Sequence, residues 1–360
     1  MGKEGGALCN EGQAWRAALH APAHRRCNVP GKKERGMKMK MLIFGGAGFI
    51  GSSFAQSLLS EGHEVEVFDS MYTGKAANLS ACTEKKGFKL IKGDMRKIEE
   101  VKRVVTGQDI IYHFVANADI RGGMENTFLD LEHNLLTTYN LLEAMRKSDV
   151  KKLVFTSSSA VYGEPSVFPT PESYGPLRPT SLYGASKLAA EGYISAFCEN
   201  FGMKSFIFRP VNILGSANNH GVVGDFIRKL KRDAKGLEIL GNGKQRKSCL
   251  HVSDFISGVK VAVGSGKEAT NIYNIGNLDW VDVDGIANQV ARAMELKGVK
   301  YSHTGGERGW PGDMPFVFLD TKKLCACGWQ PKLNSGQAVF LAAKEMLRAF
   351  DIEDKHKEHY

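Results

Sequence analysis

The 360-residue sequence has no apolar run that approaches the ~20 residues needed for a membrane-spanning helix. It also has no internal repeats and no low-complexity tracts. Its residues are 42% hydrophobic and 24% charged, which is ordinary for a globular enzyme. We therefore expect a soluble protein with no membrane partner. The chain is long enough for one large domain or two closely packed ones.

Cysteine is sparse, odd in number and scattered, so the sequence lacks the framework of a disulfide-stabilised domain. A reducing, cytoplasmic compartment fits this pattern best. The pair Cys325 and Cys327 is predicted to be incidental, and no metal site is expected. The seven cysteines are Cys9, Cys27, Cys82, Cys198, Cys249, Cys325 and Cys327.

A strong basic charge is absent from most of the chain. Residues 1–40 carry +6 of the net +9, so the body that follows is close to neutral and nucleic-acid binding is not expected. Residues 1–38 also lack the continuous apolar core of a signal peptide. His20 and His24 with Cys9 and Cys27 could be imagined as a metal site. No strand or knuckle pattern frames them, so we expect a disordered tail.

Strands and helices are predicted to alternate through the first two thirds of the chain. Such alternation predicts an α/β fold, a doubly wound parallel sheet of Rossmann type with helices on both faces. The predicted strands are residues 41–44, 64–69, 88–91, 110–115, 153–156 and 205–209. The clearest predicted helices between them are residues 49–60, 130–147 and 182–201.

The pattern loosens after residue 214, where elements are shorter. Further helices are predicted at residues 226–235, 282–297 and 335–350. We expect an NAD-binding domain over residues 39–214 and a smaller substrate-binding C-terminal lobe over residues 215–360. A segment near residues 250–263 is predicted to return to the first domain.

A glycine motif follows the first strand and opens the first helix, with Gly45, Gly48 and Gly51 spaced three apart. Glycine allows a tight turn and close approach of a pyrophosphate, and the helix N-terminus favours phosphate. Asp69 ends the second strand, where an acid can accept from ribose hydroxyls and repel a 2′-phosphate. This favours NAD over NADP. Asp94, after the third strand, could reach the adenine side.

Three serines, residues 157–159, follow the fifth strand, at the sheet edge where ligands bind in such folds. About 25 residues later, Tyr183 and Lys187 lie four apart, on one side of a predicted helix. A cation near a phenol favours the phenolate, so we expect Lys187 to lower the pKa of Tyr183. Such a tyrosine can exchange a proton near neutral pH. Together with the glycine motif, these residues predict hydride transfer to a nicotinamide.

From these motifs, residues 41–347 resemble the extended short-chain dehydrogenase/reductase family, and within it the nucleotide-sugar epimerases of the UDP-glucose 4-epimerase group. The segments that carry the resemblance read GGAGFIGS, FTSSSAVYG, YGASK and FRPVNILG. It implies an isomerase with NAD as cofactor and a nucleotide-diphosphate sugar, most simply a UDP-sugar, as substrate. It also implies a homodimer formed through a helix pair, for which residues 130–147 and 182–201 are the candidates.

The resemblance assigns roles to individual residues. Tyr183 would be general base and acid, Lys187 would hold the nicotinamide ribose, and Ser158 would be the catalytic serine. Asn134 would support the helix beside the cofactor. The implied cofactor-binding residues are Gly45, Gly48, Phe49, Ile50, Gly51, Asp69, Asp94, Met95, Ala116, Tyr183 and Lys187. The implied substrate-binding residues are Ser158, Ser159, Asn212, Lys247, Arg308 and Asp313.

Ser159 and Ala160 limit the choice of reaction, because they occupy the stretch where related dehydratases and decarboxylases carry acidic residues. Epimerisation at C4 is therefore favoured. The alternatives are a dehydratase, decarboxylase or reductase of the family, a UDP-glucuronate 4-epimerase, and a non-enzymatic NAD-sensing protein. Lys247 and Trp310 stand where the family often has arginines, which leaves the nucleotide and sugar open. The cluster Lys244, Arg246 and Lys247 could equally be a solvated loop or a diphosphate clamp.

Overall fold

The computed structural model describes residues 38–217, 221–310 and 313–357. The predicted tail lies outside these residues except for Lys38. The candidate metal ligands Cys9, His20, His24 and Cys27 therefore also lie outside them.

The centre of the fold is a seven-stranded parallel sheet, which confirms the predicted α/β fold class. Its order is β11-β6-β5-β4-β1-β2-β3. All six predicted strands are present, with ends that differ by at most two residues. The sequence reasoning missed the seventh, β11, which extends the sheet beside β6. The strands are β1 (Lys40–Phe44), β2 (Glu64–Asp69), β3 (Phe88–Lys92), β4 (Ile110–His113), β5 (Lys152–Thr156), β6 (Lys204–Pro210) and β11 (Thr270–Ile275).

The strand order reverses direction beside β1. The chain runs outward from β1 through β2 to β3 and then returns to β4 on the other side of β1. Connections leave the carboxyl ends of β1 and β4 in opposite directions, so a crevice forms there. The residues after β1 therefore lie at the place where such sheets bind ligands.

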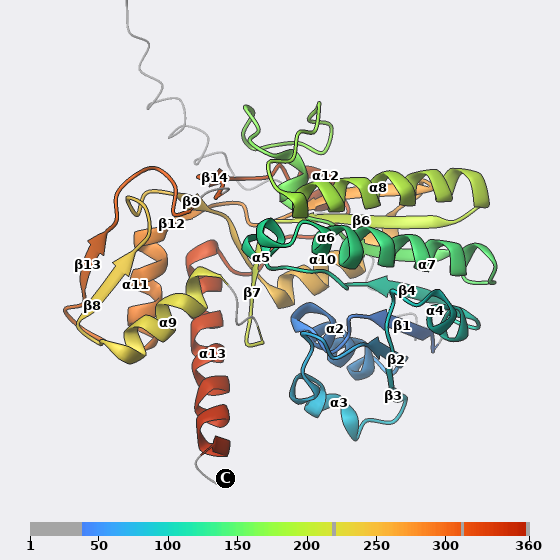
Figure 1. Cartoon of the computed structure of the whole chain (residues 1–360), viewed down its shortest axis with the longest axis horizontal. Helices are drawn as coiled ribbons and strands as arrows, with labels where there is room; N and C mark the ends of the chain where they lie inside the picture. The colour runs from blue at the N-terminus through green and yellow to red at the C-terminus, as the bar shows by residue number, and fades with distance from the viewer. Residues whose placement is uncertain (1–37, 218–220, 311–312, 358–360) are drawn as a thin grey trace, which may run out of the picture. The chain divides into compact units, whose positions relative to one another are not determined.

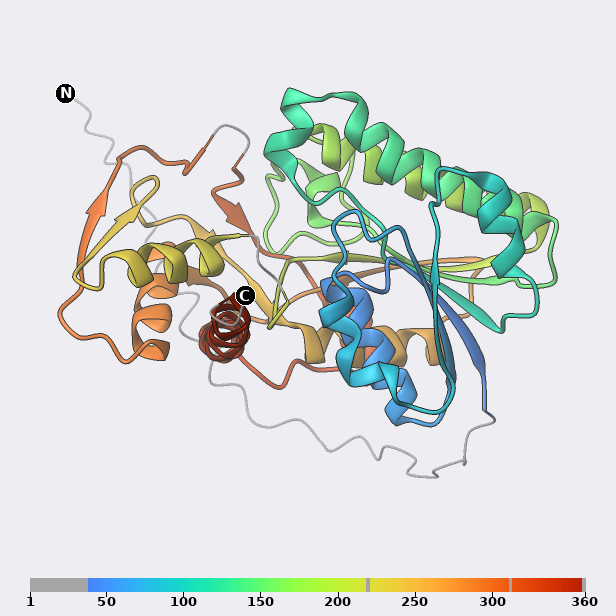
Figure 2. The same ribbon diagram turned by 60° about the horizontal axis from the view of Figure 1, so that its bottom comes forward.

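Helices cover both faces of the sheet because the side chains of each strand alternate. In β1, Ile43 packs into the core on one face, while Leu42 and Phe44 pack into the core on the other. On the first face lie α2 (Phe49–Ser60) and the returning helix α10 (Val252–Ser265), which contact each other. On the second lie α4 (Ile98–Val105), α7 (Thr137–Arg146) and α8 (Leu182–Phe201). Helices α7 and α8 run side by side (Figures 1 and 2).

The helix predicted over residues 130–147 consists of three parts instead of one. It is formed by α6 (Phe128–Asp130), the π-helical segment η3 (Leu131–Leu136) and α7. Thr137 and Thr138 donate hydroxyl hydrogen bonds to the carbonyls of His133 and Asn134. These bonds compete with the regular ladder, and π-helical turns of this kind are often found at functional sites.

The C-terminal half adds a second cluster of elements with its own apolar core. Helices α9 (Val222–Arg232), α11 (Val283–Ala293) and α13 (Ser335–Lys357) pack against the paired strands β8 (Gly236–Ile239) and β13 (Lys300–His303). The three helices overlap the ones predicted there. The division of the chain at residue 214 stays a prediction, because β11 and α10 return to the large sheet.

The remaining elements are shorter. They are η2 (Ala76–Leu79), α3 (Ser80–Thr83), α5 (Ile120–Glu125), η4 (Ser159–Tyr162), β7 (Asn212–Leu214), β9 (Arg246–Lys247), β10 (Cys249–His251), β12 (Val281–Asp282), β14 (Phe316–Val317) and α12 (Lys322–Ala326). No helix within the described ranges is both long and apolar enough to cross a membrane.

Candidate functional site

The turn between β1 and α2 depends on its glycines. Gly45 has φ +76°, and a Cβ there would lie 2.8 Å from the backbone nitrogen of Val115. A Cβ on Gly51 would lie 2.2 Å from the carbonyl oxygen of Gly45. Gly48 caps α2 without a side-chain hydrogen bond, so the helix N-terminus opens at the turn. This geometry fits a pyrophosphate held by backbone N–H groups.

Asp69 lies at the end of β2 and is directed at the same turn. Its carboxylate accepts hydrogen bonds from the backbone nitrogens of Ala47 at 2.9 Å and Met71 at 2.8 Å. Asp94, after β3, is engaged by Arg96, whose guanidinium donates to both carboxylate oxygens. Arg96 accordingly lowers the pKa of Asp94. Asp94 is therefore anionic at neutral pH, and hydrogen bonds fix both acids in position.

A cavity of about 510 Å³ opens at this edge of the sheet. All eleven residues predicted to bind the cofactor line it. Thr156, at the end of β5, also lines it. The glycine turn, the Asp69 carboxylate and the buried Lys187 amine thus line one cavity, as expected for a dinucleotide site.

Tyr183 and Lys187 occupy the first two turns of α8, which begins at the Ser181 cap. The hydroxyl of Tyr183 is hydrogen-bonded to Ser158, the residue that caps η4. Lys187 is buried, and its Nζ lies 6.0 Å from the centre of the Tyr183 ring. The predicted catalytic trio is therefore assembled at one place.

The pKa of Tyr183 departs from the prediction. Burial raises it to about 12, and the hydrogen bond with Ser158 offsets this only in part. The predicted lowered pKa of Tyr183 is therefore wrong for the polypeptide alone, because desolvation of the phenolate dominates. Burial also lowers the pKa of Lys187 to about 7, which the carboxylates of Asp130 and Glu191 oppose.

A buried polar side chain of η3 forms a hydrogen bond with α8. Asn134, in η3, donates to the Ser186 hydroxyl at 2.9 Å and to Asp130 at 3.1 Å. Its own side-chain oxygen accepts from the backbone nitrogen of Asn117 at 2.8 Å. Asn134 therefore couples the π-helical segment to the helix that carries Tyr183, as expected for a residue that supports the helix.

A second buried network was missed by the sequence reasoning. Glu191, one turn beyond Lys187, forms an ion pair with Arg209 of β6 at 2.6 Å and accepts a hydrogen bond from Ser157. Arg209 also donates to the Tyr162 hydroxyl at 2.9 Å. The only sequence signal was the position of Glu191, which extends the Tyr183–Lys187 spacing by another four residues.

The predicted substrate residues lie outside the cavity wall, and three of them form a separate polar cluster. Lys247 pairs with Asp313 at 2.7 Å. Arg308 donates to the carbonyl of Asp313 at 3.0 Å and pairs with Glu164 at 2.7 Å. Both cations are therefore partnered by acids of the protein. Arg246 lies apart from this cluster, stacked over Phe316 with 4.0 Å from guanidinium carbon to ring centre.

Apart from Ser158, the remaining two substrate candidates lie on different elements. Asn212 is an exposed residue of β7 whose side chain donates to the carbonyl of Ser248 at 3.2 Å. Ser159 is the half-buried first residue of η4, next to Ser158. Neither is joined to the Lys247 cluster by a direct hydrogen bond.

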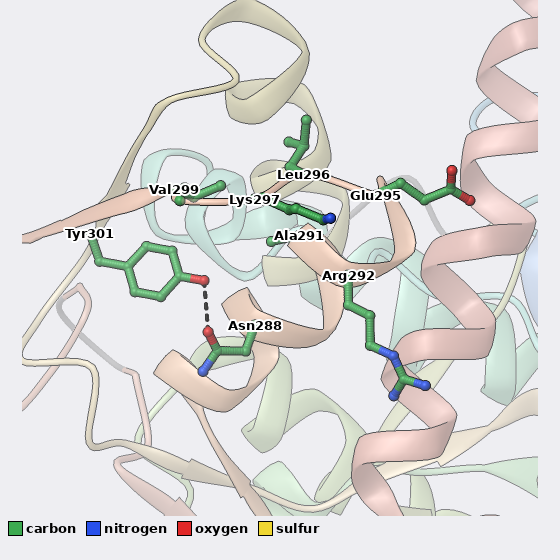
Figure 3. A pocket seen from close by; sticks show the side chains of 9 residues that line it. Asn288, Ala291, Arg292, Glu295, Leu296, Lys297, Val299 and Tyr301 are labelled. Atoms are coloured by element: carbon green, nitrogen blue, oxygen red, sulfur yellow. Dashed lines mark hydrogen bonds between the residues drawn. The ribbon is translucent and has the colours of Figure 1, made fainter.

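A second hollow, of about 530 Å³, lies between the end of α11 and the start of β13 (Figure 3). Its polar contact joins the Tyr301 hydroxyl to the side chain of Asn288 at 2.8 Å. None of the residues predicted to be functional lines it. In the part of the chain that the structure describes, no group of His, Cys, Asp and Glu side chains is arranged to hold a metal ion.

Known proteins of similar sequence agree with the geometry of the candidate NAD site. The model of the NAD dependent epimerase/dehydratase family matches residues 41–276. A putative UDP-glucose 4-epimerase of Methanocaldococcus jannaschii is 30% identical over 305 residues, which cover 83% of this chain and 95% of the relative. A UDP-glucuronic acid decarboxylase 1 of Danio rerio is 31% identical over 247 residues, which cover 67% of this chain and 57% of that protein.

Solved structures agree in fold. The crystal structure of the Thermus thermophilus UDP-glucose 4-epimerase in complex with NAD superposes with a TM-score of 0.76 at 32% identity. The match covers 86% of this chain and 100% of the other.

Proposed function

The chain belongs to the NAD dependent epimerase/dehydratase family, and from that premise we propose that it inverts C4 of a UDP-hexose through a transient 4-keto sugar. The observation that carries the proposal is that Tyr183 and Lys187 line the same cavity as the glycine turn, with Ser158 hydrogen-bonded to Tyr183. A protein that only sensed NAD would need the turn but not this trio.

In the proposed reaction Tyr183 takes the proton from the sugar 4-hydroxyl as the hydrogen on C4 leaves as hydride. Ser158 donates a hydrogen bond to the same oxygen while the carbonyl forms. NAD would be held by the glycine turn and Asp69 and would supply the hydride acceptor and donor. A protonated Lys187 would favour the Tyr183 phenolate, against the burial that raises the Tyr183 pKa. Tyr183 would then return the proton to the same oxygen as hydride is given back to the opposite face of the 4-keto sugar, which would complete the inversion.

Epimerisation is preferred to dehydration or decarboxylation because of the residues before Tyr162. Ser159 and Ala160 begin η4, so no carboxylate follows Ser158 directly to assist loss of water or carbon dioxide. Glu164, just beyond, is paired with Arg308 instead. A net redox product with free NADH would instead favour a reductase.

Lys247, Arg308 and Asp313 are the proposed contacts for the substrate diphosphate, with Asn212 and Ser159 as further candidates. Their support is the cluster that joins the first three. An arginine at this position could donate hydrogen bonds to two phosphate oxygens, whereas Lys247 offers only a point charge. Binding of the nucleotide is therefore expected to be weaker.

We also propose a cytoplasmic homodimer built on α7 and α8, with no nucleic acid among its partners. Both helices expose large apolar side chains, and the half-exposed rings of Tyr139 and Tyr193 meet edge to face with 6.2 Å between centres. Exposed aromatic patches of this kind favour association. Five cysteines of the described residues are free thiols, in keeping with a reducing compartment.

The reaction is tested with purified protein and a panel of UDP- and GDP-sugars, followed by NMR. Interconversion of a UDP-hexose and its C4 epimer, with no net change in NADH absorbance, is the expected result. A product that has lost water or carbon dioxide, or inversion at another carbon, would overturn the proposal.

A further inference from the structure

Two aromatic rings in the lining of the cofactor cavity stack on each other. Tyr72 lies on the loop after β2, and His133 lies in η3 on the opposite side of the sheet order. Their ring centres are 5.3 Å apart and their planes differ by 24°, which is a stacked arrangement. Both residues line the cavity.

The protein core does not account for the position of Tyr72. Its side chain is 71% exposed, so little of its surface is buried by packing. Its ring contact is with His133, 61 residues further along the chain. The stack therefore joins two segments that would otherwise border the opening separately.

The His133 side of the stack is anchored to the loop after β3. The Nε2 atom of His133 lies 3.4 Å from a Glu132 carboxylate oxygen, and Glu132 pairs with Arg96 at 3.3 Å. Arg96 in turn holds Asp94 at 2.7 Å. The contacts from Tyr72 to Asp94 thus form a continuous series around one end of the cavity.

The ring of His133 is suited to stacking. Burial and the positive charge of Arg96 lower its pKa, while the carboxylates of Glu132, Asp94 and Asp130 act against them. Because the net direction is downward, the imidazole is uncharged at neutral pH and stacks on Tyr72 as a neutral aromatic ring.

We propose that Tyr72 and His133 form an aromatic clasp over the adenosine end of the cofactor site, which slows the release of NAD between turnovers. The inference rests on the NAD dependence of the proposed function. Asp69, the acid suited to the ribose hydroxyls, lies three residues before Tyr72 and lines the same cavity. Asp69 and the two rings would therefore hold the same end of the cofactor.

A clasp matches the chemistry of the proposed reaction. The hydride that is taken from the sugar is given back to it, so the cofactor ends each cycle in its starting state and need not leave. Slow release then keeps the enzyme loaded. Opening the clasp would require only that one ring swing away, because Tyr72 has few other contacts.

The test is the rate at which bound NAD leaves the protein. Protein loaded with NAD is freed of excess cofactor and mixed with a second dehydrogenase that captures released NAD as NADH. Tyr72→Ala and His133→Ala are expected to release NAD about two- to tenfold faster, as loss of one aromatic pair implies. The double variant is expected to be no faster than the quicker single variant, because both remove the same contact.

Two controls keep the test specific. Tyr72→Phe keeps the ring and should release NAD at the wild-type rate. Tyr301→Ala removes a tyrosine from the second hollow and should also leave the rate unchanged. Unchanged release from both Tyr72→Ala and His133→Ala, with wild-type melting temperatures, would overturn the clasp. This readout needs no sugar, so it stands even if the protein proves not to be a C4 epimerase.

Discussion

The Nζ atom of Lys187 donates a hydrogen bond to the carbonyl oxygen of Thr156 at 2.9 Å. This bond joins the second turn of α8 to the carboxyl end of β5, directly before the three serines at residues 157–159. Lys187 is therefore fixed between the sheet and Tyr183, buried and with a pKa lowered to about 7. The amine is held by the backbone in an environment that disfavours its charge.

Lys187→Met should change how stability depends on pH in NAD-free protein. The folded-state pKa is about 7 and the ordinary value is 10.5, so between these values the unfolded state binds more protons. The free energy of unfolding of the wild type should therefore rise relative to Lys187→Met by ~1.4 kcal/mol per pH unit across this window. Below pH 7 both states carry the proton, so the penalty is fully present and the difference is constant.

Urea denaturation at pH 6, 8 and 9.5 measures this dependence. The matched control is Lys322→Met, whose side chain is 88% exposed and should give no such slope. A difference between wild type and Lys187→Met that stays flat up to pH 9.5 would contradict the burial of a titrating amine.

Gly51→Ala should weaken NAD binding, because its methyl group would lie 2.2 Å from the Gly45 carbonyl oxygen and deform the phosphate turn. A loss of tenfold or more in affinity, ~1.4 kcal/mol, is expected by isothermal titration. Gly192→Ala is the matched control, since a Cβ there meets nothing within 4 Å. Equal NAD affinity in the two variants would refute the role of the turn.

Asp69→Asn should shift the cofactor preference towards NADP. The carboxylate accepts from Ala47 and Met71 through different oxygens, and the single amide oxygen can keep only one of these bonds. Binding of both cofactors should therefore weaken somewhat, and the readout is the ratio of their affinities. The negative charge that repels a 2′-phosphate is removed. We expect the ratio of NAD to NADP affinity to fall about tenfold, ~1.4 kcal/mol. An unchanged ratio would mean that Asp69 does not face the ribose.

The double variant Tyr139→Glu, Tyr193→Glu should be a monomer by light scattering. Two carboxylates placed on the facing α7 and α8 surfaces of a dimer repel and lose hydration when buried. Leu278→Glu changes a side chain that is 57% exposed elsewhere and should leave the dimer intact. If the double variant keeps the wild-type mass of a dimer, the interface lies on another face.

Most of the nucleotide-binding half could be predicted from the sequence. The pattern of apolar strands between helices predicted β2, α2 and α8 with the observed ends. The glycine turn and Asp69 were predictable because turn geometry and strand ends constrain single residues. Their shared cavity followed from the order of the strands.

Other features could not be predicted because they depend on distant contacts. Strand β11 is short of apolar residues on one side, and its place beside β6 is set by pairing with a strand about 60 residues earlier. The Glu191–Arg209 pair is buried between α8 and β6. The four-residue spacing from Lys187 predicted a lowered pKa for Tyr183. Burial raises that pKa instead, and the extent of burial depends on residues far away in the sequence.

The central claim is that Tyr183 exchanges the proton of the sugar. Its most direct test compares wild type with Tyr183→Phe by NMR of UDP-hexose epimers, with bound NAD measured in the same samples. We predict a rate lower by at least a thousandfold, ~4 kcal/mol, with NAD content unchanged. Near-normal epimerisation by Tyr183→Phe would contradict the account.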